Sequence, residues 1–182
     1  MDRQAGAGCV GMENAVIKAP LPHNEARRLK ALRDLVILDT PPEARFDRIS
    51  AFAAKEFNVP IALVSLVDQD RQWFKSSFGM GDVQETPRDI SFCGHAVTMA
   101  KTLIVPDALA DPRFADNPMV VGHPYVRFYA GALLRLPYGQ VVGTLCIMDR
   151  RPRQFDKLDE AILNGLRDVV VEELFRREES VS

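Results

Sequence analysis

Apolar residues in this chain follow helix spacing at both ends and strand spacing in the middle. Leucines recur at helical intervals over residues 23–35, with arginine and lysine on the other faces. A second helix is expected after Thr40, which can cap it because Pro41 has no amide to leave unpaired and Glu43 can complete a capping box. The closing helix, residues 156–177, carries one apolar ridge made of Leu158, Ile162, Leu166, Val170 and Leu174.

Strand patterns fill the middle of the chain. Ile61–Val67 is apolar at both alternating positions, which predicts a strand covered on both faces, and residues 72–78 form its hairpin partner after a polar turn. A short strand at 103–105 and a second hairpin of residues 127–136 and 141–148 follow. Helices at both ends of mostly antiparallel strands predict an α+β fold. We expect a central sheet with the N- and C-terminal helices on one side and short helices and loops on the other.

The expected cover of short helices and loops contains two segments. Ser91 is a suitable cap for a short helix that continues to about residue 100. In residues 107–125, Asp111 and Asn117 each precede a proline, which favours short helical turns. This is the longest irregular stretch inside the expected domain, and such stretches often carry function.

Composition and charge agree with an ordinary globular domain and exclude some classes of protein. The chain has 182 residues, a formal net charge of -2, 47% hydrophobic residues and 26% charged residues. Acidic and basic residues are intermixed, so no basic stripe predicts nucleic-acid binding. The apolar runs are shorter than the roughly 20 residues of a membrane span.

Domain organisation and compartment follow from the same data. We expect a mobile tail over residues 1–22, one domain over 23–179 and a short tail over 180–182. The N-terminus lacks the basic and apolar regions of a secretory signal. Three cysteines without a Cys-x-x-Cys pair favour free thiols in a reducing cytoplasm: Cys9, Cys93 and Cys146.

Several ordered motifs resemble GAF domains of bacterial signalling proteins. They are Leu38–Pro41, Phe46-Asp47, Pro60–Asp68, Ser91–Ala96, Val105–Ala108, Phe128–Gly131 and Val142–Cys146. The resemblance implies a sensory or regulatory domain, similar to those that precede histidine kinase or diguanylate cyclase modules. Such domains bind a small ligand, dimerise through their terminal helices, or do both. The resemblance supplies no ligand or cofactor, because one fold serves many functions.

The candidate ligand-binding residues are expected to line a cavity between the sheet and its cover: Cys93, His95, Asp107, Arg113, Phe114, Phe128 and Tyr129. If Ser91 is a cap, Cys93 lies in the first helical turn, where free amides favour the thiolate. His95 lies about 200° further around that helix, so the pair does not face one metal ion. Arg113 can clamp an anion above Phe114. Each residue also has a structural alternative, which is core packing for the aromatic rings and turn hydrogen bonds for the aspartate.

Two further functions remain open from the sequence. A thiol-dependent enzyme of the free methionine sulfoxide reductase kind, similar only at the level of the fold, needs a second thiol near the attacking one. Cys93 and Cys146 fall on separate elements, and the sequence does not place them within bonding distance. A bilin-binding photosensor attached through Cys93 fits a cysteine near a histidine, but the neighbouring residues differ from the phytochrome pattern.

A homodimer is expected from the closing helix. Its apolar surface extends beyond the ridge through Leu163, Val169, Val171 and Phe175. A helix that is apolar over more than one face buries the second face against another surface, and a two-fold partner is the commonest provider. The alternative is that the first helix covers these residues within one chain.

Overall fold

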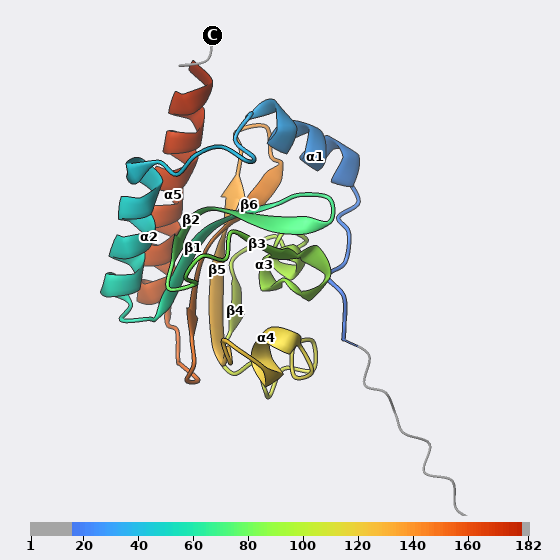
Figure 1. The fold of residues 1–182 in the computed structure, drawn as a ribbon, viewed down its shortest axis with the longest axis vertical. Coiled ribbons are helices and arrows are strands. Elements are labelled where there is room, and N and C mark those ends of the chain that lie inside the picture. The colour runs from blue at the N-terminus through green and yellow to red at the C-terminus, as the bar shows by residue number, and fades with distance from the viewer. Residues whose placement is uncertain (1–15, 180–182) are drawn as a thin grey trace, which may run out of the picture.

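The computed structural model describes residues 16–179, and the side chains of the last helix as far as Arg176. Residues 1–15 of the predicted tail 1–22, with Cys9, and the predicted tail 180–182 lie outside the described residues. Residues 16–22 of the first tail are described and contact the domain, where the Ala19 amide donates to the Asp89 carbonyl. The described chain contains a six-stranded sheet in the order β3-β2-β1-β6-β5-β4. Every neighbouring pair is antiparallel, and helices lie on both faces of the sheet (Figure 1). The predicted α+β architecture is therefore confirmed.

All strands except β3, for which no strand was predicted, lie close to their predicted positions. Their bounds are β1 Ile61–Val67, β2 Arg71–Phe78, β3 Glu85–Pro87, β4 Leu103–Val105, β5 Phe128–Arg135 and β6 Val141–Asp149. Strand β1 is buried along its whole length, as its unbroken apolar sequence predicts. Strand β6 is hydrogen-bonded to β1 on one side and to β5 on the other, and Cys146 pairs with Leu63 and Gly131 in these registers.

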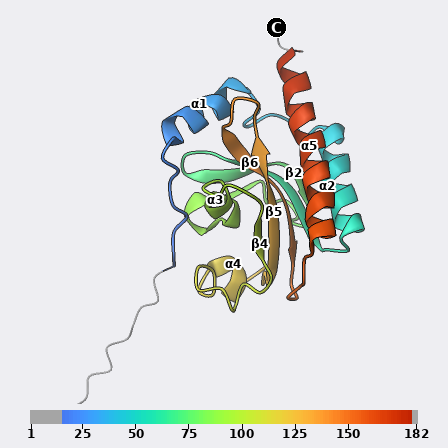
Figure 2. The same ribbon diagram turned by 180° about the vertical axis from the view of Figure 1, so that it is seen from behind.

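Helices α2 (Ala44–Glu56) and α5 (Lys157–Glu179) lie together against one face of the sheet (Figures 1 and 2). Helix α1 (Glu25–Asp34) lies across one end of the sheet and buries Leu29 and Leu32. The predicted ridge of α5 is wrong at its start, because Leu158 is 68% exposed whereas Leu163, outside the ridge, is fully buried.

The second face is covered by α3 (Phe92–Ala96) and α4 (Pro118–Val121), as Figure 2 shows. The short helix η1 (Arg88–Ile90) directly precedes α3. The predicted caps are confirmed for both short helices. Ser91 Oγ accepts a hydrogen bond from the Gly94 amide, and Asn117 Oδ1 accepts one from the Met119 amide. Helix α3 is shorter than expected and ends at Ala96.

The expected Thr40 cap is wrong. Helix α2 begins at Ala44, and the residue in the cap position is Glu43. The Thr40 hydroxyl instead donates to the Ile37 carbonyl and accepts a hydrogen bond of 2.9 Å from Lys75 Nζ on β2. The local sequence pattern predicts that the Thr40 hydroxyl accepts from an amide of α2, but in the structure it accepts from the ammonium group of Lys75 on a distant strand.

Candidate functional site

The space between the sheet and the α3–α4 cover, where a ligand cavity is expected, is filled by aromatic side chains. Phe92 stacks on Phe114 with 4.1 Å between ring centroids, and Tyr129 stacks on Phe92 at 5.1 Å. His95 adds an edge contact to Phe114 at 4.8 Å. The rings of Phe114 and Tyr129 are completely buried. These residues therefore form the core of this side.

Phe128 does not belong to this group. It contacts Phe155 on the α2–α5 side of the sheet, with ring centroids 5.5 Å apart. Successive residues of a strand point to opposite faces, so Phe128 and Tyr129 cannot line one cavity. The expectation that both do so is wrong for that reason.

Asp107 and Arg113 make local contacts at the surface. Asp107 Oδ1 accepts the Leu109 amide in a turn. Arg113 Nη2 lies 2.6 Å from Asp111 Oδ2, and the hydrogen bond from Arg113 lowers the pKa of Asp111. An anion at Arg113 has to compete with this carboxylate. Both residues border a shallow depression of about 490 Å³, away from the thiols described next.

The chemically distinctive group is a buried cluster around two thiols. The Cys93 sulfur accepts hydrogen bonds from Thr144 Oγ1 at 3.2 Å and Tyr129 Oη at 3.4 Å. The Cys146 sulfur lies 3.8 Å from the Cys93 sulfur, within hydrogen-bond distance of it. The two cysteines are 1% and 0% exposed and are not bonded to each other. Helix α3 thus brings Cys93 directly over the central strand β6, which the sequence alone did not establish.

Protons are distributed unequally within this thiol cluster. Burial raises the pKa of Cys93, but hydrogen bonds with Cys146, Thr144 and Tyr129 outweigh it and hold the pKa below its usual value. The hydrogen bond to Cys93, together with burial, raises the pKa of Cys146 well above its usual value. Burial and the neighbouring Cys93 charge raise the pKa of Tyr129. The arrangement favours a thiolate on Cys93 and a proton on Cys146.

His95 faces away from this cluster toward an N-terminal strap, which we define as residues 16–22. His95 Nε2 lies 3.3 Å from the Ile17 carbonyl, and burial lowers the pKa of the imidazole. The Ala19 amide donates to the Asp89 carbonyl at 3.2 Å. The strap therefore covers α3 from outside, and His95 and Cys93 have separate partners, as the helical angle predicts.

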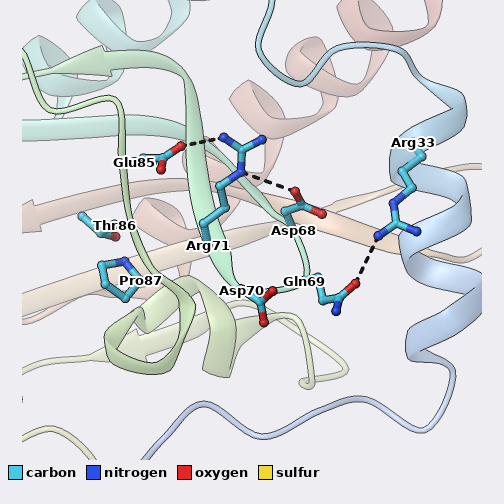
Figure 3. Close-up of a pocket in the computed structure, with 8 residues that line it drawn as sticks. All are labelled: Arg33, Asp68, Gln69, Asp70, Arg71, Glu85, Thr86 and Pro87. Carbon is cyan, nitrogen blue, oxygen red and sulfur yellow. Dashed lines mark hydrogen bonds and ion pairs between the residues drawn. The ribbon is translucent and has the colours of Figure 1, made fainter.

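A hollow of about 570 Å³ lies at the turn between β1 and β2. Figure 3 shows Arg71 between Glu85 and Asp68, and Arg33 of α1 reaching Gln69. The Arg71 guanidinium also pairs with Asp39 at 2.7 Å. The charges of Asp68 and Glu85 in the lining are paired with Arg71. The hydrogen bond from Arg33 to Gln69 links α1 to this turn.

Beside that turn lies a buried ionic cluster that the sequence analysis missed. Glu25 pairs with both Arg28 and Arg88, whose side chains are 1% and 3% exposed. Arg28 also donates to the Val67 carbonyl at 2.6 Å, which ties α1 to the end of β1. Two nitrogens of Arg88, Nε and Nη2, are buried without a partner among the described residues. Local charge patterns give no sign of such burial, because surface arginines have the same spacing.

Residues 16–179 contain neither a membrane-spanning helix nor a cluster of metal-binding side chains. No helix there is long and apolar enough to cross a membrane. No group of three or more histidine, cysteine, aspartate or glutamate side chains there is arranged to hold a metal ion.

The sequence model of the GAF domain family matches residues 41–173. The chain belongs to the GAF domain family. A cyclic di-GMP phosphodiesterase of Pseudomonas aeruginosa is 44% identical over 134 residues, which are 74% of this chain and 23% of the phosphodiesterase. The aligned part of this chain thus spans less than a quarter of the phosphodiesterase.

Solved structures of other proteins share this fold. The free methionine-R-sulfoxide reductase of Neisseria meningitidis, in complex with its substrate, matches with a TM-score of 0.62 at 20% identity, over 86% of this chain and 93% of the other. The GAF domain of an Acinetobacter phosphoenolpyruvate-protein phosphotransferase gives 0.61 at 17% identity, over 85% and 96%. Likeness at these identities shows the fold alone.

Proposed function

We propose that this GAF domain is a sensory or regulatory module that acts on an enzyme of cyclic di-GMP turnover. The observation that carries the proposal is the 44% identity with the Pseudomonas aeruginosa phosphodiesterase over 134 residues. Because the aligned segment is 23% of that protein, we assign regulation rather than hydrolysis to the domain. A histidine kinase or diguanylate cyclase is the alternative output partner. The free thiols Cys93 and Cys146 agree with a cytoplasmic location.

A domain exchange tests this function. Residues 23–179 replace the matching segment of the Pseudomonas aeruginosa phosphodiesterase, and hydrolysis of cyclic di-GMP is compared among the parent, the exchange and a deletion of that segment. We expect the exchange to keep the rate closer to the parent than the deletion does. An exchange protein that behaves like the deletion contradicts the proposal.

A small ligand is the proposed input, and its site forms when the α3–α4 cover opens. Ligand pockets combine apolar walls with a few polar anchors, and Phe92 and Phe114 supply such walls above Cys93 and Thr144. Intact mass and absorbance of the purified protein test for a retained metabolite, a haem or a bilin. An apo mass with no visible absorbance argues against a tightly bound chromophore.

A homodimer along α5 is the proposed assembly. Leu158 and Val169 are 68% and 42% exposed, and they share one face because they lie about three turns apart. Light scattering at micromolar protein is expected to show a dimer that Val169→Glu dissociates, and a monomer contradicts this assembly. Leu32 of α1 is fully buried within the chain. Leu32→Glu is therefore expected to disturb folding and does not test the dimer.

A thiol-dependent reductase is a second candidate, favoured by the 3.8 Å between the sulfurs of Cys93 and Cys146. Such an enzyme needs an attacking thiolate and a second thiol that resolves the oxidised intermediate. Incubation with free methionine sulfoxide and a thiol reductant tests it. Methionine formation that Cys93→Ser abolishes supports the enzyme, and absence of turnover rejects it.

A further inference from the structure

We propose that Cys93 and Cys146 form a reversible intramolecular disulfide when the domain meets a hydroperoxide. The two sulfurs lie 3.8 Å apart within the thiol cluster. This modification goes beyond the proposed regulatory function and does not depend on it.

The geometry brings the two sulfurs within reach of a bond. A disulfide has a sulfur–sulfur length of about 2.05 Å. The two sulfurs, now 3.8 Å apart, therefore have to move closer by about 2 Å. Strand β6 cannot supply this movement, because β1 and β5 hold it by hydrogen bonds on both sides of Cys146. Helix α3 has only five residues, so a small shift of α3 toward the sheet closes the distance.

The neighbouring hydroxyls prepare Cys93 as the sulfur that reacts first. Thr144 and Tyr129 both donate hydrogen bonds to its sulfur, and donors of this kind stabilise the negative charge of a thiolate. The thiolate is the nucleophilic form of cysteine. The Cys146 sulfur lies 3.8 Å from the same Cys93 sulfur. It is therefore placed to resolve the oxidised form of Cys93.

The reaction balances with one hydroperoxide per disulfide. The Cys93 thiolate attacks one oxygen of hydrogen peroxide, the O–O bond breaks, and a sulfenic acid and hydroxide form, the hydroxide taking up a proton to become water. The Cys146 thiol then loses its proton and attacks the Cys93 sulfur, which forms the S–S bond and releases a second water. The two thiols are oxidised by two electrons in total, and the peroxide is reduced. A thiol reductant reverses the bond by exchange.

Access to Cys93 requires opening of α3 and the strap. The strap rests directly on α3, because a Cβ added at Gly94 would lie 2.7 Å from the Ala19 Cβ. Its ion pair between Lys18 and Asp89 is solvent-exposed, with side chains 73% and 56% accessible, and exposed pairs hold weakly. Local opening of such short segments costs less than global unfolding.

Peroxide treatment of the Cys9→Ser protein tests the disulfide. The folded protein is treated with hydrogen peroxide, and its intact mass and a non-reducing peptide map are recorded. We expect loss of two hydrogens, a linked peptide pair containing Cys93 and Cys146, and full reversal by dithiothreitol. In Cys146→Ser the same treatment should leave a sulfenic acid on Cys93 that dimedone traps, whereas Cys93→Ser should give neither product.

Three outcomes would overturn the proposal. One is that both thiols survive in the folded protein at peroxide concentrations that oxidise them in urea. Another is that Cys93 proceeds to the sulfinic acid while Cys146 stays unmodified. The last is that the linked peptides form only in urea. The mass and peptide map of the Cys9→Ser protein decide the question even if the Cys93 and Cys146 variants fail to fold.

Discussion

The ring of Tyr129 lies over the backbone of Gly131, two positions further along β5. A Cβ added at Gly131 would lie 2.1 Å from the Tyr129 hydroxyl oxygen and 2.7 Å from its Cζ. A glycine inside a strand marks a bulge or a close approach of another group. The close neighbour is a side chain of the same strand, which the missing Cβ allows to turn toward Cys93.

Gly131→Ala should lower the free energy of unfolding by about 3 kcal/mol, because the added methyl group overpacks a buried ring. Denaturant titration of both proteins measures the effect. Gly165→Ala on α5 is the matched control, since its added Cβ meets nothing within 4 Å. It should stabilise the helix by about 0.5–1 kcal/mol. Equal midpoints for the Gly131→Ala protein and the parent would contradict the packing argument.

Thr144→Val should raise the pKa of Cys93, which the Thr144 hydroxyl helps to lower. The substitution keeps the shape of the side chain and removes the hydroxyl that donates to the Cys93 sulfur. Cys93 then forms the thiolate at higher pH, so the alkylation rate rises at higher pH than in the parent protein. The rate with iodoacetamide against pH in the Cys9→Ser background measures the shift. Thr98→Val, whose hydroxyl bonds the His95 carbonyl instead, should leave the profile unchanged.

Glu25→Gln should remove a pH-dependent part of the stability. Burial raises the pKa of Glu25, but hydrogen bonds from Arg28 and Arg88 outweigh it and lower the pKa from 4.5 to about 2. A carboxyl group with a lowered pKa stabilises the fold above the unfolded value of 4.5, and this contribution is lost as the pH falls through 2. We expect a loss of about 3 kcal/mol at pH 7.

The pH dependence separates this effect from simple loss of packing. The difference between the Glu25→Gln protein and the parent should shrink between pH 4.5 and 2. Asp34→Asn is the control on the same helix, because its ion pair with Lys30 is exposed and should contribute little. A difference that stays constant with pH argues against the ionic explanation.

Thr40→Ala should cost about 1–3 kcal/mol, since the charged Lys75 loses an acceptor. The side chain of Lys75 is fully buried, so water cannot replace the hydroxyl without rearrangement. Thr40→Ser keeps the hydroxyl and should cost much less. Thermal or denaturant unfolding measures both. Similar losses for the two variants would show that the methyl group, rather than the hydrogen bond, matters here.

The sequence by itself determined the elements and their order. The unbroken apolar run of β1 predicts burial on both faces because each parity is apolar. Ser91 and Asn117 predict their helix starts because a cap involves residues only two or three positions apart. Strand β3 escaped prediction, because Glu85–Pro87 has no apolar alternation that would mark it as a strand. Its backbone pairing with β2 is decided by the tertiary structure.

Only the tertiary structure decided which distant side chains meet. Cys93 and Cys146 are 53 positions apart, and their contact depends on how α3 lies over β6. Lys75, which is 35 positions away in the sequence, donates a hydrogen bond to the Thr40 hydroxyl. Periodicity assigns a residue to a face of its own element, but it carries no information about the partner across the interface. The register of the sheet and the packing of its cover supply that partner, because they place atoms from separate elements within bonding distance.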